Sequence, residues 1–211
     1  MIQCHDSPYT LPHEEAVTIK ELDSKAPAIA FSGEKVLYGV QDTSLGACMI
    51  AVLDGWICGL AFVGEIGLEQ ALGDLRKAWP SLAIVEHRHA TKTALEKAFD
   101  AWEGRRGSPV NPVKILLKGT VFQRLVWKAL LTIPRGTTTS YQSIAHNIGY
   151  PRSIRAVGQA VGSNPVALLI PCHRVLYKHG QLGGYHWGLH SKKRLLSKEG
   201  AFARRGVGVD A

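Results

Sequence analysis

The sequence predicts an α/β (α+β) fold: a small N-terminal antiparallel sheet with helices, followed by a mostly helical domain that contains a helix-turn-helix. Three observations support this prediction. Strand-like apolar alternation dominates residues 36–63, helical spacing dominates from residue 120 onward, and the charge changes sign between the two halves. Residues 1–110 carry a net charge of −5 (10 Lys+Arg, 15 Asp+Glu), whereas residues 111–211 carry +13 (15 Lys+Arg, 2 Asp+Glu).

The N-terminal half shows a hairpin signal and two helical patterns. Residues 1–34 lack clear periodicity, which predicts a loose extension. The pair Asp54-Gly55 separates two apolar runs, as expected of an antiparallel hairpin. Apolar residues at helical spacing then predict one helix over 67–79 and a second over 91–103.

A segment rich in glycine, proline and serine, "EGRRGSPVNPV" (103–113), coincides with the change of charge. Such composition is typical of a linker. We therefore expect one domain over 35–110, a second over 111–204 and a short tail over 205–211.

Composition limits the classes of function. A net charge of +13 in one half suggests a polyanionic partner such as DNA, although ordinary solubilising charge is the alternative. No apolar run reaches the length of about 20 residues that spans a bilayer, so no membrane partner is expected. Four cysteines without a CxxC pair indicate free thiols in the cytoplasm. Cys4 and Cys58 could bind a structural zinc with a histidine, but without recognisable spacing we expect no metal or cofactor.

The basic half contains capped helical patterns. Thr120 is a plausible N-cap for a helix that ends near Ile133. The segment 140–165 predicts two short helices, capped by Ser140 and Ser153, which is the helix-turn-helix pattern. Any pair of short amphipathic helices produces the same pattern.

The second of these short helices has an outer face of small residues. Arg155, Gln159 and Gly162 fall on one stripe, with Ala156 beside them. A narrow minor groove admits a helix with small side chains, and a single arginine could enter the base stack where a nucleotide has flipped out. Close helix packing is the alternative reason for small residues.

A cysteine follows a buried segment in "LIPCHRVL" (169–176). The run "VALLI" (166–170) predicts a short buried strand that Pro171 ends, which places Cys172 at the edge of the core. A lone cysteine is often only a small buried hydrophobe. The adjacent His173 and Arg174 favour a nucleophile instead, because a nearby cation or base lowers a thiol pKa.

The histidine needs an orienting partner to act as a base. Adjacent side chains on an extended chain point apart, so we expect His173 to reach Cys172 through a bridging water. Glu199 and Asp210 are the only carboxylates after residue 110, and Asp210 lies in the tail. The residues therefore predict a chain of contacts from Glu199 through His173 and water to Cys172.

Several segments together resemble one family. They are "GTVFQRLVWKALLTIPRG", "SYQSIAHNIG", "RAVGQAVGSNP", "LLIPCHRV", "GGYHWG" and "LLSKEG". They are similar to the O6-alkylguanine-DNA alkyltransferases (methylated-DNA–protein-cysteine methyltransferases), most of all to the C-terminal half of the bacterial adaptive-response protein. The resemblance implies a ribonuclease-H-like N-terminal domain. It also implies single-turnover transfer of an alkyl group from O6-alkylguanine, or O4-alkylthymine, in double-stranded DNA to a cysteine of a monomer, without a cofactor.

The resemblance also implies a role for each matching position. Cys172 accepts the alkyl group, with His173 as the base and Glu199 as its partner. Asn164 is the hinge between the site and the DNA-reading helix, and Tyr141 donates to the departing guanine. Arg155 is the implied DNA-binding arginine and Tyr141 lies at the same interface, to which the helix face adds Gln159 and Ala156. The implied alkylguanine pocket consists of Tyr185 and the backbone carbonyl of Val175, and we expect His186 and Trp187 at its rim.

Two bulky residues depart from the pattern of many relatives. His186 and Trp187 stand where small residues are frequent, so we expect a restricted pocket that reacts slowly with a benzylated guanine. Two other functions remain as alternatives: a non-catalytic sensor of alkylguanine, which would not need Cys172, and a cysteine hydrolase, which would not need the basic half.

Overall fold

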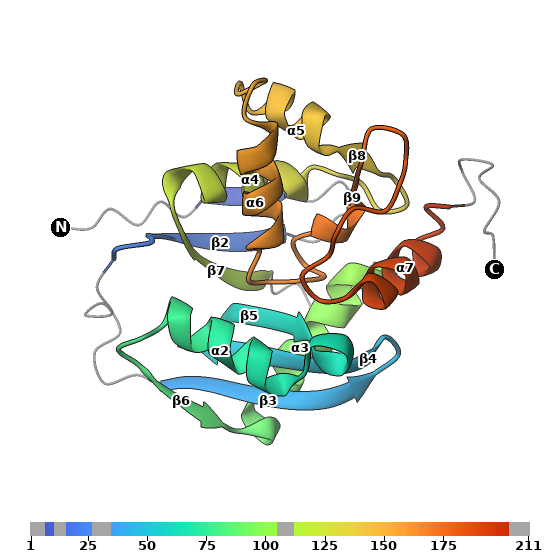
Figure 1. Ribbon diagram of the computed structural model, residues 1–211. Coiled ribbons are helices and arrows are strands. Elements are labelled where there is room, and N and C mark those ends of the chain that lie inside the picture. Colours follow the sequence, from blue (N-terminus) through green and yellow to red (C-terminus); the bar gives the residue numbers. More distant parts are fainter. Residues whose placement is uncertain (1–6, 11–15, 27–34, 105–111, 203–211) are drawn as a thin grey trace.

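The computed structural model describes residues 7–10, 16–26, 35–104 and 112–202, whose main feature is a mixed seven-stranded sheet (Figure 1). Its strand order is β1-β2-β7-β5-β4-β3-β6. The strands are β1 (Ser7–Thr10), β2 (Ala16–Asp23), β3 (Lys35–Thr43), β4 (Gly46–Leu53), β5 (Trp56–Phe62), β6 (Ala83–Glu86) and β7 (Val113–Gly119). No helix in these ranges is long and apolar enough to cross a membrane.

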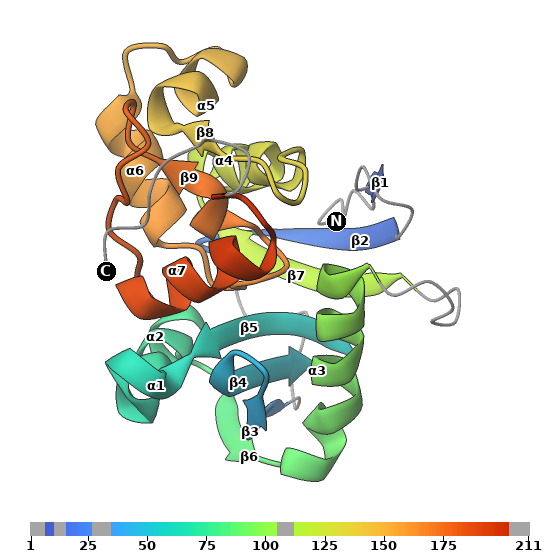
Figure 2. The same cartoon turned by 90° about the vertical axis from the view of Figure 1, so that its right-hand side faces the viewer.

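The centre of the sheet is the predicted antiparallel meander β3-β4-β5. Asp54 (φ 49°) and Gly55 (φ 74°) connect β4 to β5 with left-handed backbone, as a two-residue hairpin requires. Helices α1 (Val63–Ile66) and α2 (Leu68–Ala78) cover one face, and α3 (Arg88–Glu103) covers the other (Figure 2). The two predicted helices are thus confirmed, and we call the sheet with α1–α3 the sheet lobe.

The sheet is larger than predicted and is not purely antiparallel. Residues 16–23, expected in a loose extension, form β2, which pairs in parallel with β7 from Val17↔Val113 to Asp23↔Gly119. Parallel pairs also join β7 to β5 and β6 to β3. The prediction failed because the partner of β2 lies far along the chain, and no local pattern reports such a pairing.

The remaining elements form a second group that we call the helical lobe (residues 120–202). They are α4 (Val121–Leu131), β8 (Thr139–Ser140), α5 (Tyr141–Asn147), α6 (Ile154–Gly162), the 3-10 turn η2 (Cys172–Arg174), β9 (Val175–Leu176) and α7 (Leu189–Lys198). Thr120 caps α4 in a reciprocal capping box with Gln123, and the Ser140 hydroxyl caps α5. Ser153 is the N-cap residue of α6, but its side chain makes no capping hydrogen bond.

The segment 166–170 joins the helical lobe to the middle of the sheet. It is buried as predicted, but it is a turn rather than a strand, with Leu168 at φ 69°. Leu60 of β5 donates its N–H to the Pro165 carbonyl (3.0 Å), and its own carbonyl accepts from Ala167 (2.9 Å). A central strand therefore positions the chain immediately before Cys172.

We predict that Ile19→Ala lowers the free energy of unfolding by about 2 to 5 kcal/mol, the range for emptying a core position. Ile19 is 1% exposed in β2. Urea denaturation should detect this loss, and Thr18→Ala, at a partly buried position on the same strand, should cost less. Equal and small losses of free energy of unfolding in both variants would contradict this prediction and support a loose extension instead.

Candidate active site

Cys172 stands at the start of η2, where Pro171 redirects the chain out of the buried turn. The residue is 3% exposed, and it contributes to the wall of a pocket of about 870 Å³. The Asn164 amide nitrogen donates to the Ile170 carbonyl (2.9 Å) and to the Cys172 sulfur (3.0 Å). The Asn164 amide oxygen accepts from the Val166 N–H (3.0 Å). Asn164 therefore closes the turn and presents a hydrogen-bond donor to the thiol.

The groups around this sulfur have opposite effects on the pKa of the thiol. Burial raises the pKa of Cys172, while the hydrogen bond from Asn164, the positive charge of Lys192 and the hydroxyl of Tyr185 lower that pKa. Cys58 lies in β5, where burial raises the pKa of its thiol to about 12. Cys172 therefore differs from a core cysteine in having three groups that stabilise its thiolate.

His173 contacts Glu199 as the sequence predicted, with 3.0 Å between Nε2 and Oε1. Cys172 and His173 are neighbours in a 3-10 turn, however, and not on the extended chain that we expected. Burial lowers the pKa of His173, and the Glu199 carboxylate only partly opposes that effect. A neutral imidazole donates from Nε2 to Glu199 and leaves Nδ1, which has no partner in the described part of the chain, as an acceptor.

Glu199 has more partners than the sequence predicted. Its carboxylate accepts from Arg174 through Nε (2.9 Å) and a terminal nitrogen (2.8 Å), and from the Trp102 indole N–H (2.7 Å). Burial by itself raises the pKa of Glu199, but the hydrogen bonds and charges of His173 and Arg174 hold that pKa well below its usual range. The carboxylate is therefore ionised, and it fixes both side chains that follow Cys172.

Lys192 is the main residue that sequence reasoning missed. This side chain is fully buried, and its Nζ donates to the carbonyls of Val175 (2.7 Å) and Gly183 (3.3 Å). Burial lowers the pKa of Lys192 to about 8. The sequence did contain a signal for its burial. Lys192 and the C-cap residue Glu199 lie at i and i+7 on the same face of α7 as the buried Leu195 and Leu196.

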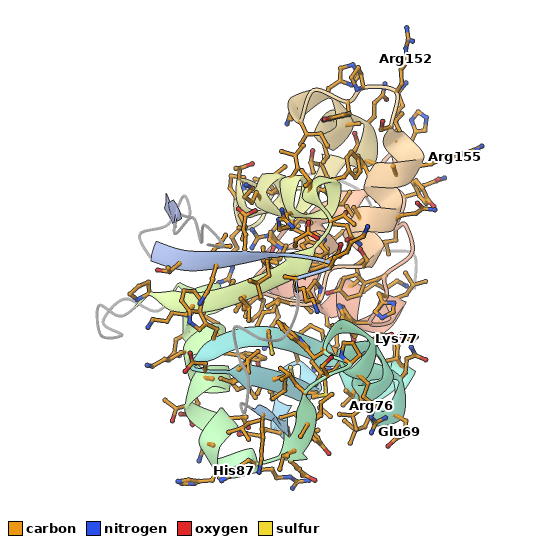
Figure 3. All side chains as sticks on the ribbon, turned by 90° about the vertical axis from the view of Figure 1, so that its left-hand side faces the viewer. Glu69, Arg76, Lys77, His87, Arg152 and Arg155 are labelled. Carbon is orange, nitrogen blue, oxygen red and sulfur yellow. The ribbon has the colours of Figure 1, made fainter. Side chains whose placement is uncertain are left out.

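The pocket connects Cys172 with helix α6. The residues from the α6 side are Ile154, Arg155, Gly158, Gln159, Val161 and Gly162; those near the thiol include Tyr141, Tyr177, Gly184, Tyr185 and His186. Arg155 is exposed and projects from α6, with Arg152 nearby (Figure 3). Ala156 is partly buried and is not one of the described residues that line the pocket.

Tyr141 and Tyr185, which line the pocket, keep their protons at neutral pH. Burial raises the pKa of Tyr141 and, more strongly, that of Tyr185. Both hydroxyls can therefore donate a hydrogen bond. The carbonyl of Val175, predicted to accept from guanine, already accepts from Lys192, although an amide oxygen has a second lone pair for another donor.

The structure corrects the placement of Trp187. Its side chain is 4% exposed, belongs to the core and does not line the pocket, because a large indole gains most from burial. His186 does line the pocket and packs edge-on against the indole, with 4.4 Å between ring centroids. The His186 Nε2 also lies 2.8 Å from the Asp74 carboxylate of α2. Only one of the two bulky residues therefore narrows the pocket.

The described residues contain no group of three or more histidine, cysteine, aspartate or glutamate side chains that could hold a metal ion. Cys58 is buried in the sheet, and Cys4 lies outside the described ranges. His87, another candidate ligand type, caps α3 by accepting from the Ala90 N–H (3.1 Å).

Comparisons with known proteins point to one family. Residues 121–201 match the family described as 6-O-methylguanine DNA methyltransferase, DNA binding domain. A methylated-DNA–protein-cysteine methyltransferase of Mycolicibacterium paratuberculosis is 52% identical over 162 residues (77% of this chain, 91% of the relative). The inducible one of Bacillus subtilis is 41% identical over 143 residues (67% and 79%).

The bifunctional transcriptional activator/DNA repair enzyme Ada of Escherichia coli is 35% identical over 173 residues, and the chain spans only 45% of its length. Among solved structures, Mycobacterium tuberculosis OGT in complex with DNA aligns with a TM-score of 0.62 at 32% identity, covering 79% of this chain and 94% of that one. The shared fold and the shared sequence define the class of protein, the methylated-DNA–protein-cysteine methyltransferases. This chain belongs to the methylated-DNA–protein-cysteine methyltransferase family.

We predict that Glu199→Gln lowers the free energy of unfolding by about 3 to 5 kcal/mol near neutral pH, because it leaves the Arg174 charge buried without its partner. The folded-state pKa of Glu199 is below the usual value, so its contribution is present at neutral pH and is lost as the pH falls through that folded-state pKa.

Urea denaturation at about pH 7 and about pH 3 measures both effects: the difference between wild type and variant should shrink in acid. Glu69→Gln, on the exposed start of α2, serves as the control and should change little at either pH. A deficit of Glu199→Gln that stays constant across this range would contradict the prediction.

Proposed function

We propose that this chain repairs DNA by irreversible transfer of a methyl or other small alkyl group from O6-alkylguanine, and from O4-alkylthymine, to its own Cys172. The observation that carries the proposal is the pocket itself. The pocket is lined both by a thiol that accepts a hydrogen bond from Asn164 and by helix α6 with the exposed Arg155. A base that enters from the α6 side would meet the sulfur.

The DNA-binding part of the proposal concerns α5 and α6 as a helix-turn-helix. The two helices are joined by a short connection, and the outer side of α6 carries Gly158 and Gly162, which leave space where a larger side chain would project. Such a surface suits the narrow minor groove. Arg155 would fill the gap left by the flipped nucleotide, with Gln159, Ala156 and Tyr141 at the same interface.

The chemistry is an in-line displacement at carbon. The Cys172 sulfur forms a bond to the alkyl carbon while the bond from that carbon to O6 of guanine breaks, and the electron pair stays with the departing base. The Tyr141 hydroxyl would donate to that base, and the carbonyl of Val175 would accept from its amino group. A thioether is stable, so each molecule would act once.

The proton of the thiol needs an acceptor. His173 is neutral and held through Nε2 by Glu199, so its Nδ1 could accept the thiol proton through a bridging water. The resulting imidazolium would be stabilised by the Glu199 carboxylate, as in a catalytic triad. Asn164 would act as the hinge that joins this machinery to α6.

Two finer points complete the proposal. The meander β3-β4-β5, followed by helix α2 and by β6 parallel to β3, supports a ribonuclease-H-like description of the sheet lobe. The free thiols of Cys48, Cys58 and Cys172 support a cytoplasmic location. A sensor that only binds alkylguanine would need neither the Cys172 thiol nor an acceptor for its proton.

We predict that one equivalent of label moves from DNA containing radiolabelled O6-methylguanine to Cys172, after which the reaction stops. Cys172→Ala should abolish transfer and retain DNA binding, because it removes only the acceptor. Peptide mapping of the labelled protein measures this, and Cys58→Ala, which removes a different buried thiol, should still transfer. Repeated turnover, or tight binding without transfer by the wild type, would refute the proposed repair reaction.

We predict that His186→Gly accelerates transfer from O6-benzylguanine by about tenfold or more and leaves the methyl rate nearly unchanged, because only His186 of the bulky pair lines the pocket. Trp187→Ala should instead lower the free energy of unfolding by about 3 to 5 kcal/mol without such selectivity. Single-turnover rates with both substrates distinguish the two effects. Equal acceleration of methyl and benzyl transfer by His186→Gly would count against a steric role.

A further inference from the structure

The start of helix α7 lacks a capping group of its own. Its N-cap residue is Gly188, at φ 94°, which has no side chain to accept from the free N–H groups of the first turn, and that turn contains no acidic residue. A helix that begins in this way needs an acceptor from elsewhere in the molecule.

The acceptor comes from the sheet lobe. The Glu65 carboxylate of α1 accepts from the Ser191 N–H (2.9 Å) and lies 3.4 Å from the Ser191 hydroxyl. Partial burial opposes ionisation of Glu65, but hydrogen bonds from the backbone of Ser191 and His190 lower its pKa, so the cap is charged. A Cβ at position 188 would lie 2.2 Å from this carboxylate, so the glycine permits the close approach.

The same turn of α7 carries Lys192. The Lys192 N–H closes the first helical hydrogen bond, to the Gly188 carbonyl (3.2 Å), and its Nζ reaches Val175 and Gly183 on either side of the pocket loop. The position of the Lys192 charge relative to the thiol therefore depends on where α7 begins. Glu65, in the sheet lobe, fixes the first turn of α7 through its hydrogen bond from Ser191.

We propose that Glu65 is a positioning residue for alkyl transfer: it anchors the start of α7 and thereby holds Lys192 on the carbonyls of Val175 and Gly183, at the end of the turn that carries Cys172. The role in alkyl transfer rests on the proposed function. The effect of Glu65 on the reactivity of the Cys172 thiol can be measured without DNA.

The titratable groups that face the Cys172 thiol come from three elements. They are Lys192 of α7, Tyr185 of the preceding loop and Tyr141 of α5, and the neutral Asn164 faces it as well. Of these, Lys192 alone is positive, and its charge lowers the pKa of Cys172. Displacing Lys192 should therefore raise the pKa of the thiol, whereas simple loosening that admits water should lower it, because burial is what raises it.

The test is the rate at which iodoacetamide alkylates Cys172 at about pH 7, where Lys192 is mostly charged, followed by mass spectrometry. Glu65→Ala should slow this alkylation about threefold, because a smaller fraction of the thiol is ionised, and should slow methyl transfer by a similar factor. Glu65→Gln keeps an oxygen acceptor and should restore an alkylation rate close to that of wild type. Glu69→Ala, on the same side of the sheet lobe (Figure 3), is the matched control and should change nothing.

The outcomes separate the inference from the proposed function. Unchanged or faster alkylation of Cys172 in Glu65→Ala overturns the positioning role, even if methyl transfer becomes slower. Slower alkylation in a protein that transfers no methyl group from DNA supports the link to Cys172 and refutes the proposed repair function instead. Thermal denaturation of each variant confirms that the folded protein is being alkylated.

Discussion

The buried carboxylate of Glu199 is the interaction on which the rest of the site depends. It accepts hydrogen bonds from Trp102 of α3, from Arg174, and from His173 in the neutral form that its burial favours. One carboxylate thus joins the sheet lobe, the turn that carries the thiol and the end of α7. Removing a charged partner from such a cluster costs far more than it would at the surface, since the remaining charge has no water to solvate it. The hydrogen bond to this carboxylate also sets the orientation of the His173 ring.

The chemistry at Cys172 reflects a balance between protection and activation. Burial raises the pKa of the thiol and restricts reagents to the pocket, whereas Asn164, Lys192 and Tyr185 lower the pKa within it. A fully exposed thiolate would react with many electrophiles in the cell. In the proposed reaction, a thiol that acts once would benefit from remaining mostly protonated until a substrate fills the pocket. Lys192 is important in this balance because its charge is itself buried.

The sheet lobe contributes to the site at several points. Leu60 of β5 hydrogen-bonds to Pro165 and Ala167, on both sides of Val166. A strand at the centre of the sheet therefore positions the turn before Cys172. Asp74 contacts His186 at the pocket wall, and Glu65 caps α7. These contacts join the sheet lobe to the turn before Cys172, to His186 at the pocket wall and to the start of α7.

The sequence alone determined the features that depend on neighbouring residues: the Asp54-Gly55 turn, the Thr120 cap, and Cys172 with His173 and its partner Glu199, found because carboxylates are scarce in the basic half. Only the tertiary structure decided the rest. β2 pairs with a strand about 95 residues away, the segment 166–170 is a turn held by a side chain, and Trp187 faces the core. Packing also decided that the Lys192 charge is buried, although its place on the apolar stripe of α7 could be read from the sequence. Local patterns report turns, caps and helix faces, whereas sheet pairing and the burial of a charge are set by contacts between distant segments.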